Sequence, residues 1–344
     1  FEMNLLSTLL LIFLLPTLTS AWGKDGHELV GNLAYRLLSD HTQAIVQQIL
    51  VNHPSTSSSS TNTPLGDVAD WADQVRIHPD YHWSGALHYI DIHDEGGCPV
   101  YNRTDAQQKA CHFFYERDCR KDACVAGSIV NYTHHLSDYV RLPNRRLRGS
   151  TALLAPYKSF PQPNLVQEAL MFLTHFVGDI HQPLHAARES DRGGNTISVT
   201  FSVPSLLSHH HQELHAVWDT SIILRALHTT YQHDRDALEE ELLGYIYKAN
   251  TTGEMKEWLV CPDTSDTKCT SSWAEESWQH ALQWAYNNTD GGEVTSGTHL
   301  TDEYYETRWP QIQHYLAVAG VRLAAALELV LGAGPQQEDV GLLS

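Results

Sequence analysis

The sequence predicts an all-α protein folded as a single helical domain. Three observations support this: apolar residues recur at helical spacing in several segments, strand-like alternation is rare, and no repeat or linker clearly divides the chain. Without a predicted 21-residue leader, 323 of the 344 residues remain (344 − 21), which is enough for one large domain or two small ones. The absence of a clear linker favours one domain.

The helices are predicted from apolar side chains three and four residues apart, which share one face of a helix. They are marked by Leu29, Leu33, Leu37 and Leu38, by Leu165, Ala169, Phe172, Phe176 and Ile180, and over residues 216–227, 236–249, 274–286 and 304–331. Residues 85–92 are predicted to be extended, and the alternation in 195–203 (NTISVTFSV) predicts a short β-hairpin. The segments 55–63 and 290–298 are rich in Ser, Thr and Gly and are predicted to be loops.

The N-terminal segment has the features of an export signal. Residues 4–20 form an apolar run, and Thr19-Ser20-Ala21 is a small-x-small cleavage pattern directly before Trp22. We therefore expect residues 1–21 to be a signal peptide and residues 22–344 to form the mature domain. No membrane span is expected to follow, because Arg322 and Glu328 interrupt the next most apolar segment, 315–333, which we interpret as a packed terminal helix.

Cysteines and sequons fit an exported, extracellular or secretory-pathway protein. An even number of cysteines in such a chain favours disulfides over thiolate metal ligands, although sequence alone does not pair them. The cysteines are Cys98, Cys111, Cys119, Cys124, Cys261 and Cys269. Four Asn-x-Ser/Thr sequences predict N-glycosylation at Asn102, Asn131, Asn250 and Asn287.

The net charge of −19 argues against a broad basic groove for duplex DNA. An acidic protein that acts on phosphates must concentrate positive charge locally, and bound divalent cations can supply it.

Histidine and aspartate recur at a spacing that suits a metal site. His175 and Asp179 stand four residues apart on one predicted helix face, and Pro183 would end that helix and let His185 turn back. His215 and Asp219 repeat the spacing on a second helix. Imidazole and carboxylate ligands in this arrangement favour zinc.

Further candidate ligands lie nearer the N-terminus. If Ala21 is the last residue of the leader, Trp22 gains a free α-amine that forms a five-membered chelate with its own carbonyl, close in sequence to His27. Asp73 precedes Arg76 by one helical turn, and His88 lies between apolar neighbours. Read alone, Asp73 is an ordinary helix acid and His88 a buried core histidine.

The order of these motifs resembles the class I zinc-dependent, single-strand-specific nucleases, the family of secreted fungal nucleases and plant bifunctional nucleases. The order is WGxxGH at the mature N-terminus, then WAD, HYID, THFVGDIHQPLH, GGN and LHxVWD. The resemblance covers essentially the whole mature chain and implies the helical fold shared with zinc phospholipase C, with three zinc ions at the floor of a cleft. It implies one zinc on Asp73, His88, His175 and Asp179, a second on the amine and carbonyl of Trp22 with His27 and the shared Asp179, and a third on His185, His215 and Asp219.

The implied activity is hydrolysis of single-stranded RNA and DNA to 5′-phosphorylated products, with 3′-nucleotidase activity on mononucleotides, in a monomeric enzyme. Alongside Asp179, the resemblance assigns a phosphate contact to Arg76 and an orienting role to Asp91. Tyr89 would stack on the base beside the scissile phosphate, and Asp191 and Asn195 would line the base pocket. As plain structural residues, Tyr89 would be a core aromatic, and Asp191 and Asn195 would be turn residues.

Two other functions are compatible with the motifs. A zinc phospholipase C shares the His-x-x-x-Asp-x5-His segment, but its last ligand pair normally ends in Glu after a shorter gap than that between His185 and His215. An inactive secreted zinc-binding protein would keep the ligands for stability alone. The run His209-His210-His211 is predicted to be a solvated loop, and His134 and His135 match no ligand position.

Overall fold

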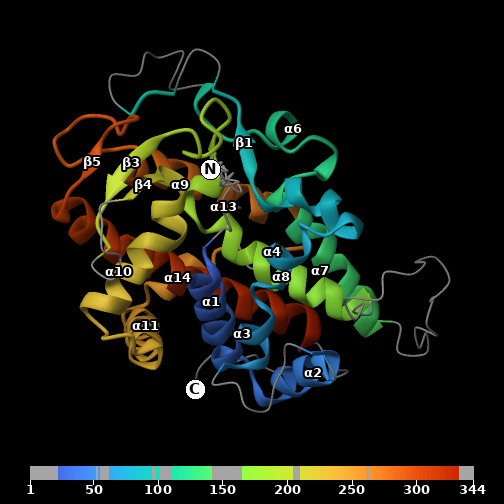
Figure 1. Cartoon of the computed structure of the whole chain (residues 1–344). Coiled ribbons are helices and arrows are strands. Elements are labelled where there is room, and N and C mark those ends of the chain that lie inside the picture. The colour runs from blue at the N-terminus through green and yellow to red at the C-terminus, as the bar shows by residue number, and fades with distance from the viewer. Residues whose placement is uncertain are drawn as a thin grey trace, which may run out of the picture.

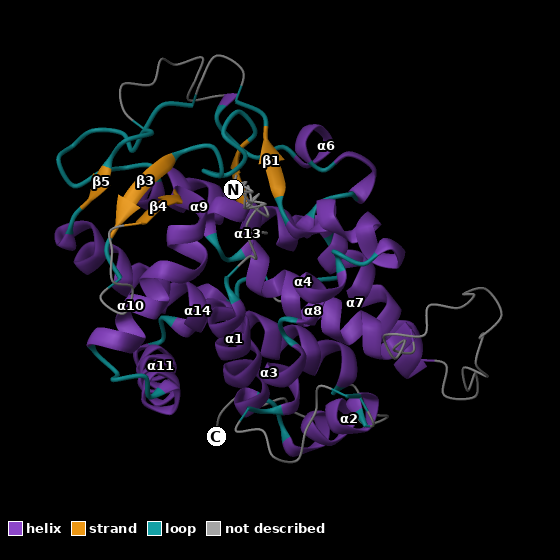
Figure 2. Cartoon of the chain, in the orientation of Figure 1, coloured by secondary structure: helices purple, strands orange, loops and turns teal. Residues whose placement is uncertain are grey.

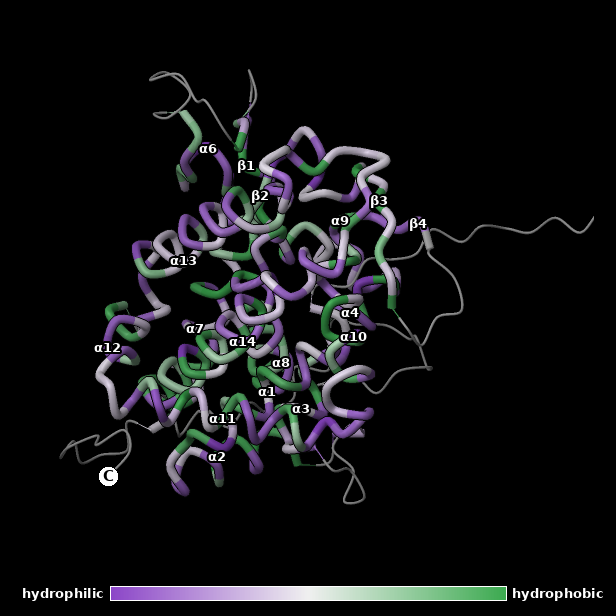
Figure 3. Tube along the Cα trace, turned by 90° about the vertical axis from the view of Figure 1, so that its left-hand side faces the viewer, coloured by the Kyte–Doolittle hydropathy of each residue, from purple (hydrophilic) through white to green (hydrophobic). Residues whose placement is uncertain are grey.

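Helices from distant parts of the sequence surround one buried helix, α8 (Leu165–Ile180). A computed structural model describes residues 22–51, 53–54, 62–94, 98–100, 110–141, 165–203, 210–261 and 263–332. Nearly every residue of α8 is buried, as expected for a helix that is apolar on all sides. It packs against α7 (Val125–Arg141), α1 (Lys24–Leu37) and α14 (Asp302–Leu331). Figure 1 shows this arrangement, and Figure 3 shows hydrophobic residues concentrated along these central helices.

The remaining helices lie around this centre, and Figure 2 shows how few strands accompany them. They are α2 (Asp40–Leu50), α3 (Pro64–Val68), α4 (Trp71–Val75), α6 (Tyr115–Asp118), α9 (Leu214–Ala216), α10 (Ile222–Thr229), α11 (Arg235–Thr252), α12 (Met255–Trp258) and α13 (Thr267–His280). Short 3-10 segments are η1 (Pro79–His88), η2 (Arg120–Asp122) and η3 (Pro183–His185), and π-helical turns are η4 (Val217–Ser221) and η5 (Ala281–Ala285). The predicted all-α, single-domain fold is confirmed, as is each predicted helix.

The C-terminal helix α14 is long and apolar enough to cross a membrane, but 83% of its most apolar window is buried inside the fold. Arg322 and Glu328, which interrupt its apolar sequence, both have hydrogen-bond partners in the fold. Glu328 accepts hydrogen bonds from Thr42 Oγ1 at 2.7 Å and from the backbone N–H of Ser39 at 2.5 Å. The prediction of a packed terminal helix is therefore confirmed for residues up to 332.

Two short parallel strands bring together segments that are far apart in the sequence. Strand β1 (Ile90–Ile92) pairs with β2 (Ala186–Arg188), with Ile90 opposite Ala186. The expectation of an extended segment over 85–92 was wrong in its first half, because η1, which has Pro79 at its first position, continues through His88. The pairing places His88 and His185, which end η1 and η3, next to each other.

The second sheet has the order β4-β3-β5, formed by β3 (Ser198–Phe201), β4 (His210–Glu213) and β5 (His299–Leu300). The prediction of a hairpin within 195–203 was wrong in extent, since that segment supplies only β3 and its antiparallel partner is β4. His210 and His211 therefore belong to a strand and not to the predicted loop, because their backbone pairs with Phe201 and Thr200. His209 lies outside the described residues.

The six cysteines form three local disulfides, Cys98–Cys111, Cys119–Cys124 and Cys261–Cys269. Among the sequons, Asn131 is exposed on α7, while Asn250 on α11 and Asn287 are half-buried. Asn102 lies outside the described residues. Disulfides of this kind fit the oxidising environment of the secretory pathway.

Candidate metal centre

Buried histidines and aspartates form three overlapping groups that could each hold a metal ion. The groups are His27, Asp73 and His175; His88, His175 and Asp179; and His185, His215 and Asp219. Each side chain comes from a different turn of the elements already described: α1, α4, η1, α8, η3, α9 and η4. The structure thus brings together all eight side chains that the sequence analysis singled out as ligands beyond Trp22.

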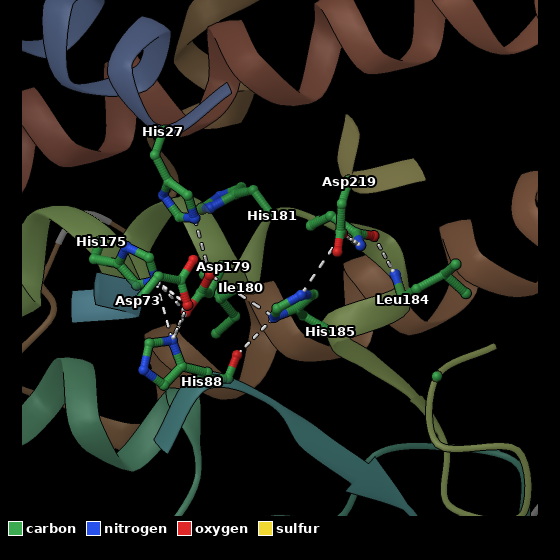
Figure 4. A network of polar contacts seen from close by, with 12 residues as sticks. His27, Asp73, His88, His175, Asp179, Ile180, His181, Leu184, His185 and Asp219 are labelled. Atoms are coloured by element: carbon green, nitrogen blue, oxygen red, sulfur yellow. Dashed lines mark hydrogen bonds and ion pairs between the residues drawn. The ribbon is translucent and has the colours of Figure 1, made fainter. Parts of the chain in front are cut away.

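The Asp179 carboxylate lies between histidines on both of its sides (Figure 4). Its Oδ1 is 3.3 Å from His27 Nε2. Its Oδ2 is 3.1 Å from His88 Nδ1 and 3.3 Å from His175 Nε2. A carboxylate whose two oxygens face separate sets of nitrogens has the geometry needed to bridge two cations.

Asp73 completes this cluster on the side of His88 and His175. Its Oδ1 lies 3.5 Å from His88 Nδ1 and 3.7 Å from His175 Nε2. The same oxygen is 3.2 Å from Arg76 Nε, one helical turn further on. Arg76 is thereby held at the edge of the cluster.

The third group is built around Asp219. Its two oxygens lie 3.8 Å from His185 Nε2 and 3.2 Å from His215 Nε2. Gln182 fixes this carboxylate by donating a hydrogen bond from Nε2 to Asp219 Oδ1, while Oε1 of Gln182 accepts a hydrogen bond from Leu184 N–H at 2.6 Å. The sequence analysis missed Gln182, since a glutamine between two histidines carries no distinctive signal.

Backbone carbonyls orient three of the imidazole rings. The Nδ1 atoms of His175, His185 and His215 lie 2.7, 2.7 and 2.6 Å from the carbonyl oxygens of Ala69, His88 and Gly193, respectively. If each Nδ1–H donates to its carbonyl, each Nε2 lone pair is directed into the cluster, which is the usual outer support of metal-binding histidines. Gly193 has a φ of 61°, and a Cβ there would lie 2.2 Å from Leu184 O, so this turn requires glycine.

Several buried polar atoms of the cluster have no hydrogen-bond partner among the residues that the structure describes. They include His27 Nε2, His185 Nε2, both carboxylate oxygens of Asp179, and Asp219 Oδ2. Buried polar groups are nearly always satisfied, and leaving one unpaired costs about 1–3 kcal/mol. Atoms of this kind converging on one another fit bound cations.

The electrostatics of the cluster also suit a cation. Burial, followed by repulsion from neighbouring histidines, lowers the pKa of His27, His88 and His185 well below the ordinary value, so these rings are neutral and offer lone pairs. Burial raises the pKa of Asp179 to about 7. Burial opposes charge on His175 as well, but the carboxylates of Asp179 and Asp73 outweigh it and raise its pKa to about 9. Metal binding would displace the proton held here.

The predicted mature N-terminus lies against this cluster. Trp22 is fully buried, and the N–H of Gly23 donates to Asp219 O at 2.7 Å. The His27 ring stacks on His175 with centroids 3.8 Å apart. Close approach requires Gly178, because a Cβ there would lie 2.8 Å from His27 Nδ1 and 3.8 Å from Trp22 Cδ1.

A cleft of about 580 Å³ adjoins the cluster. Of the predicted site residues, its lining contains Arg76, Tyr89, Asp91, His185, Asn195 and His215. Arg192 also lines it and was not singled out from the sequence, where it appears as an ordinary loop cation. Arg76 and Arg192 bring two cations to this cleft, which the carboxylates of Asp91 and Glu213 also line.

The predicted base-pocket residues differ in where they lie. Asn195 lines the cleft and donates a hydrogen bond from Nδ2 to Arg192 O at 2.7 Å. Asp191 is buried beneath the turn, where Oδ1 accepts from Gly194 N–H at 2.7 Å and from the Tyr286 hydroxyl at 2.8 Å. Asp191 is not among the described lining residues, so the structure does not bring it together with Asn195 at the cleft surface.

Asp91 is a half-buried carboxyl group on the cleft wall. Burial, then repulsion from Glu189, raises its pKa to about 6. Such a group changes charge near neutral pH and is a candidate for proton handling or for polar contact with a ligand.

Other histidines lie outside the cluster. His134 lines a separate cavity, and His135 packs near Tyr132. His181 makes contacts away from the metal groups: its Nδ1 is 2.7 Å from Val177 O, and its Nε2 is 2.9 Å from Arg322 Nη1.

Comparison with known proteins shows which family and which relatives this chain resembles. The family pattern described as S1/P1 Nuclease matches residues 22–332. Endonuclease 2 of Arabidopsis thaliana is 35% identical over 334 residues, covering 94% of this chain and 95% of that protein. Nuclease S1 of Aspergillus oryzae is 30% identical over 318 residues (92% and 94%), and Nuclease P1 of Penicillium citrinum is 30% identical over 304 residues (88% and 95%).

Proposed function

The chain belongs to the S1/P1 nuclease family, and on that premise we propose that this phosphodiesterase cleaves single-stranded RNA and DNA to 5′-phosphorylated products and acts as a 3′-nucleotidase on mononucleotides. The observation that carries the proposal is the junction of the three Asp/His groups with the cleft. His185 and His215 belong to the third group and also line the cleft, beside Arg76. A phosphate in the cleft would therefore meet the metal ligands and a cation together.

We propose zinc as the metal, since neutral imidazoles and carboxylates without thiolates suit it. The proposed ligands are Asp73, His88, His175 and Asp179 for one ion; the Trp22 amine and carbonyl, His27 and Asp179 for a second; and His185, His215 and Asp219 for a third. When bound, the zinc ions would act as Lewis acids and lower the pKa of water toward neutrality.

The chain's own residues would bind and orient the substrate around these ions. Arg76 is held against Asp73 at 3.2 Å and would contact a phosphate oxygen from the cleft wall. Asp179, whose two oxygens face His27 and His88, would be a ligand shared by two of these ions. Asp91, with a pKa of about 6, would accept a hydrogen bond from a ligand or water once ionised.

The preference for unpaired strands would come from stacking. Tyr89 follows His88 directly, lines the cleft and is 40% exposed, so part of this residue is accessible to a ligand. A base inside a duplex offers no free face to such a ring, whereas an unpaired base does. Asn195 would offer polar contacts to the same base, and Asp191 would act by holding the turn that carries Asn195.

We also propose that the protein enters the secretory pathway and is cleaved after Ala21. The three disulfides fit an oxidising compartment. The Trp22 side chain is buried, and both it and His27 lie near Gly178, so a free α-amine at Trp22 would stand close to the cluster.

The proposal is tested by measuring release of acid-soluble nucleotides from denatured and native DNA, with phosphatidylcholine hydrolysis assayed in parallel, before and after treatment with a chelator. We expect rapid, chelator-sensitive cleavage of denatured DNA and RNA, and slow cleavage of native DNA. Phosphate release from 3′-AMP but not from 5′-AMP would support the nucleotidase activity. Equal rates on native and denatured DNA would contradict single-strand preference, and hydrolysis of phosphatidylcholine without nuclease activity would contradict the proposal as a whole.

A further inference from the structure

A second cavity, of about 520 Å³, shares no lining residue with the cleft. It lies between η1, the loop that contains η2, and α7. Its lining includes the aromatic residues Trp83, Tyr115 and Tyr132 together with Lys121, Asn131 and His134. A concave site with aromatic walls and a few polar groups is typical of ligand binding.

Trp83 gives this cavity a rigid aromatic surface. The side chain is 53% exposed, although its Nε1–H donates to Asp80 O at 2.9 Å and its ring lies 5.9 Å from the Phe172 ring. One part of the indole is therefore fixed against the core while another part faces solvent. A large aromatic held in this way loses little conformational entropy when a ligand covers it.

The part of the lining that comes from the loop containing η2 is fixed as well. The Cys119–Cys124 disulfide closes the loop, and Lys121 and Asp122 both have positive φ, 60° and 59°. Asp122 accepts a hydrogen bond from the Tyr115 hydroxyl at 2.8 Å. A Cβ on Gly127 would lie 2.4 Å from Asp122 O, so this close packing requires glycine at that position.

Asn131, the acceptor of the Asn131-Tyr132-Thr133 sequon, lines the same cavity. It is exposed, whereas Thr133 is buried and its hydroxyl lies 2.9 Å from Thr264 Oγ1. A sugar attached to Asn131 would thus start within reach of the cavity walls. The exposed indole of Trp83 and the glycan acceptor Asn131 are two independent features that line the same cavity.

We propose that the N-linked glycan of Asn131 folds back into this cavity and that its first N-acetylglucosamine units cover Trp83. The glycan would thereby link α7, which carries Asn131, to η1, which carries Trp83. The C–H face of a pyranose carries slight positive charge and matches the electron-rich face of an indole. Its hydroxyl and acetamido groups can hydrogen-bond to Lys121 and His134 at the rim. Covalent attachment makes the contact intramolecular, so that even a weak sugar–indole interaction is populated.

A nucleobase is the other ligand with a face to stack on Trp83, and the charge of the cavity disfavours it. Sites for single strands combine stacking with a positively charged groove. Here Lys121 is followed directly by Asp122, and the protein carries a net charge of −19. A neutral sugar needs no such groove.

The inference rests on the proposed secretory route and not on the proposed reaction, so glycan occupancy and nuclease activity can fail independently. The experiment uses the full chain secreted from a eukaryotic host. Glycopeptide mass spectrometry measures occupancy at Asn131, and hydroxyl-radical footprinting measures oxidation of Trp83. We compare the wild-type protein with Asn131→Gln and with Asn250→Gln, a matched control that removes a helical sequon with no described link to the cavity.

We expect Asn131 to be occupied and oxidation of Trp83 to rise severalfold in Asn131→Gln but not in Asn250→Gln. An unoccupied Asn131, or equal oxidation of Trp83 in all three proteins, would overturn the proposal. So would protection of Trp83 in the wild-type glycoprotein by a phosphorothioate oligothymidylate, since the surface would then serve a base.

A double-mutant cycle tests the contact itself. Asn131→Gln should lower Tm by about 1–3 °C more than Asn250→Gln does, and this difference should vanish in a Trp83→Leu background. Trp83→Leu alone is expected to destabilise the protein through its contact with Phe172, but the cycle removes that contribution. A glycan effect on Tm that is unchanged by Trp83→Leu would place the sugar elsewhere and refute the contact.

Discussion

Two histidine-rich clusters both draw on the segment 175–185 of the chain, and they differ in the charges that surround them. The first, which we call the Asp–His cluster, contains the eight residues of the three metal-capable groups. The second, the Arg322 cluster, contains the buried His181 and Arg322 and the half-buried Glu276, His280 and His314. His181 lies only two residues after Asp179, yet it belongs to the second cluster.

Arg322 and His181, the two buried members of the Arg322 cluster, both have hydrogen-bond partners. Arg322 Nη1 lies 2.7 Å from Glu276 Oε2 and 2.9 Å from His181 Nε2, and its Nε donates to Trp258 O at 2.9 Å. With Nδ1 of His181 directed at Val177 O, both ring nitrogens are engaged. A guanidinium already fills the place that a cation would take.

The Asp–His cluster has carboxylates where the other has a guanidinium. Several of its buried atoms, including both carboxylate oxygens of Asp179 and Nε2 of His185, face one another without hydrogen-bond partners in the described part of the chain. Histidine content alone therefore does not make a metal site. Buried negative charge combined with unfilled lone pairs does, and each prediction below tests that distinction.

The largest effect is expected from Asp179→Asn, which removes the negative charge that faces three histidines. Changes in the residues that merely orient metal ligands cost about 10–100-fold in affinity or activity. Loss of a bridging ligand should exceed that, with turnover falling by more than about a hundredfold. Metal analysis of the purified protein should show fewer than the three zinc ions proposed for wild type. Near-normal activity and metal content in Asp179→Asn would show that the carboxylate does not bridge.

A comparable loss is expected if a residue is left ahead of Trp22. An α-amine can bind zinc, whereas the amide nitrogen formed by an additional residue is a poor ligand. Protein retaining Ala21 should lose one zinc and nearly all activity, although its helices and disulfides form. Trp22→Phe with a native N-terminus should be much milder, because the indole contributes packing alone. Full zinc and full activity in a protein shown by mass spectrometry to be unprocessed would exclude the N-terminal chelate.

The two clusters are compared directly by His185→Ala and His181→Ala. The first should lower zinc content by one ion and reduce activity strongly, because His185 Nε2 faces Asp219. The second should leave zinc content unchanged but destabilise the fold by about 1–3 kcal/mol, since Arg322 loses a buried partner. Zinc analysis and denaturant unfolding separate the two outcomes. Loss of zinc in His181→Ala with retention in His185→Ala would reverse the assignment.

The sequence predicted some of this site and not the rest, for physical reasons. Helical periodicity places His175 beside Asp179, so that pair follows from spacing alone. The meeting of His88 with His185 depends on the β1–β2 pairing, which joins segments too short and too far apart for periodicity to reveal. The carbonyls that orient His175 and His215 carry no side-chain signal at all.

A smaller effect should follow from Gly178→Ala, which alters packing and leaves every ligand in place. The added Cβ would lie 2.8 Å from His27 Nδ1, and the His27 ring is confined by its stacking on His175. We expect weaker zinc retention during dialysis against a chelator and activity lowered by about tenfold. Gly244→Ala is a matched control, because no atom lies within 4 Å of the new Cβ. Unchanged zinc retention in Gly178→Ala would mean that His27 does not need its observed position.

The smallest effect concerns protonation in the Arg322 cluster. Burial, together with repulsion from His314 and Arg322, lowers the pKa of His280 to about 4 despite the attraction of Glu276. The unfolded chain, with a pKa near 6.5, therefore binds a proton before the folded protein does, and stability is lost as pH falls from 6.5 to 4. His280→Phe keeps the ring that stacks on Tyr315 and removes the titration. As pH falls from 7 to 4, the free energy of unfolding of His280→Phe should rise by about 1–2 kcal/mol relative to that of wild type. This value is reduced because the His280 ring is partly exposed to solvent. Because acid releases metal from both proteins alike, the difference between their free energies of unfolding isolates His280. If the difference between the two free energies of unfolding stays constant with pH, His280 is not held neutral by its surroundings. The contrast between the Asp–His cluster and the Arg322 cluster would then rest on His181 and Arg322 alone.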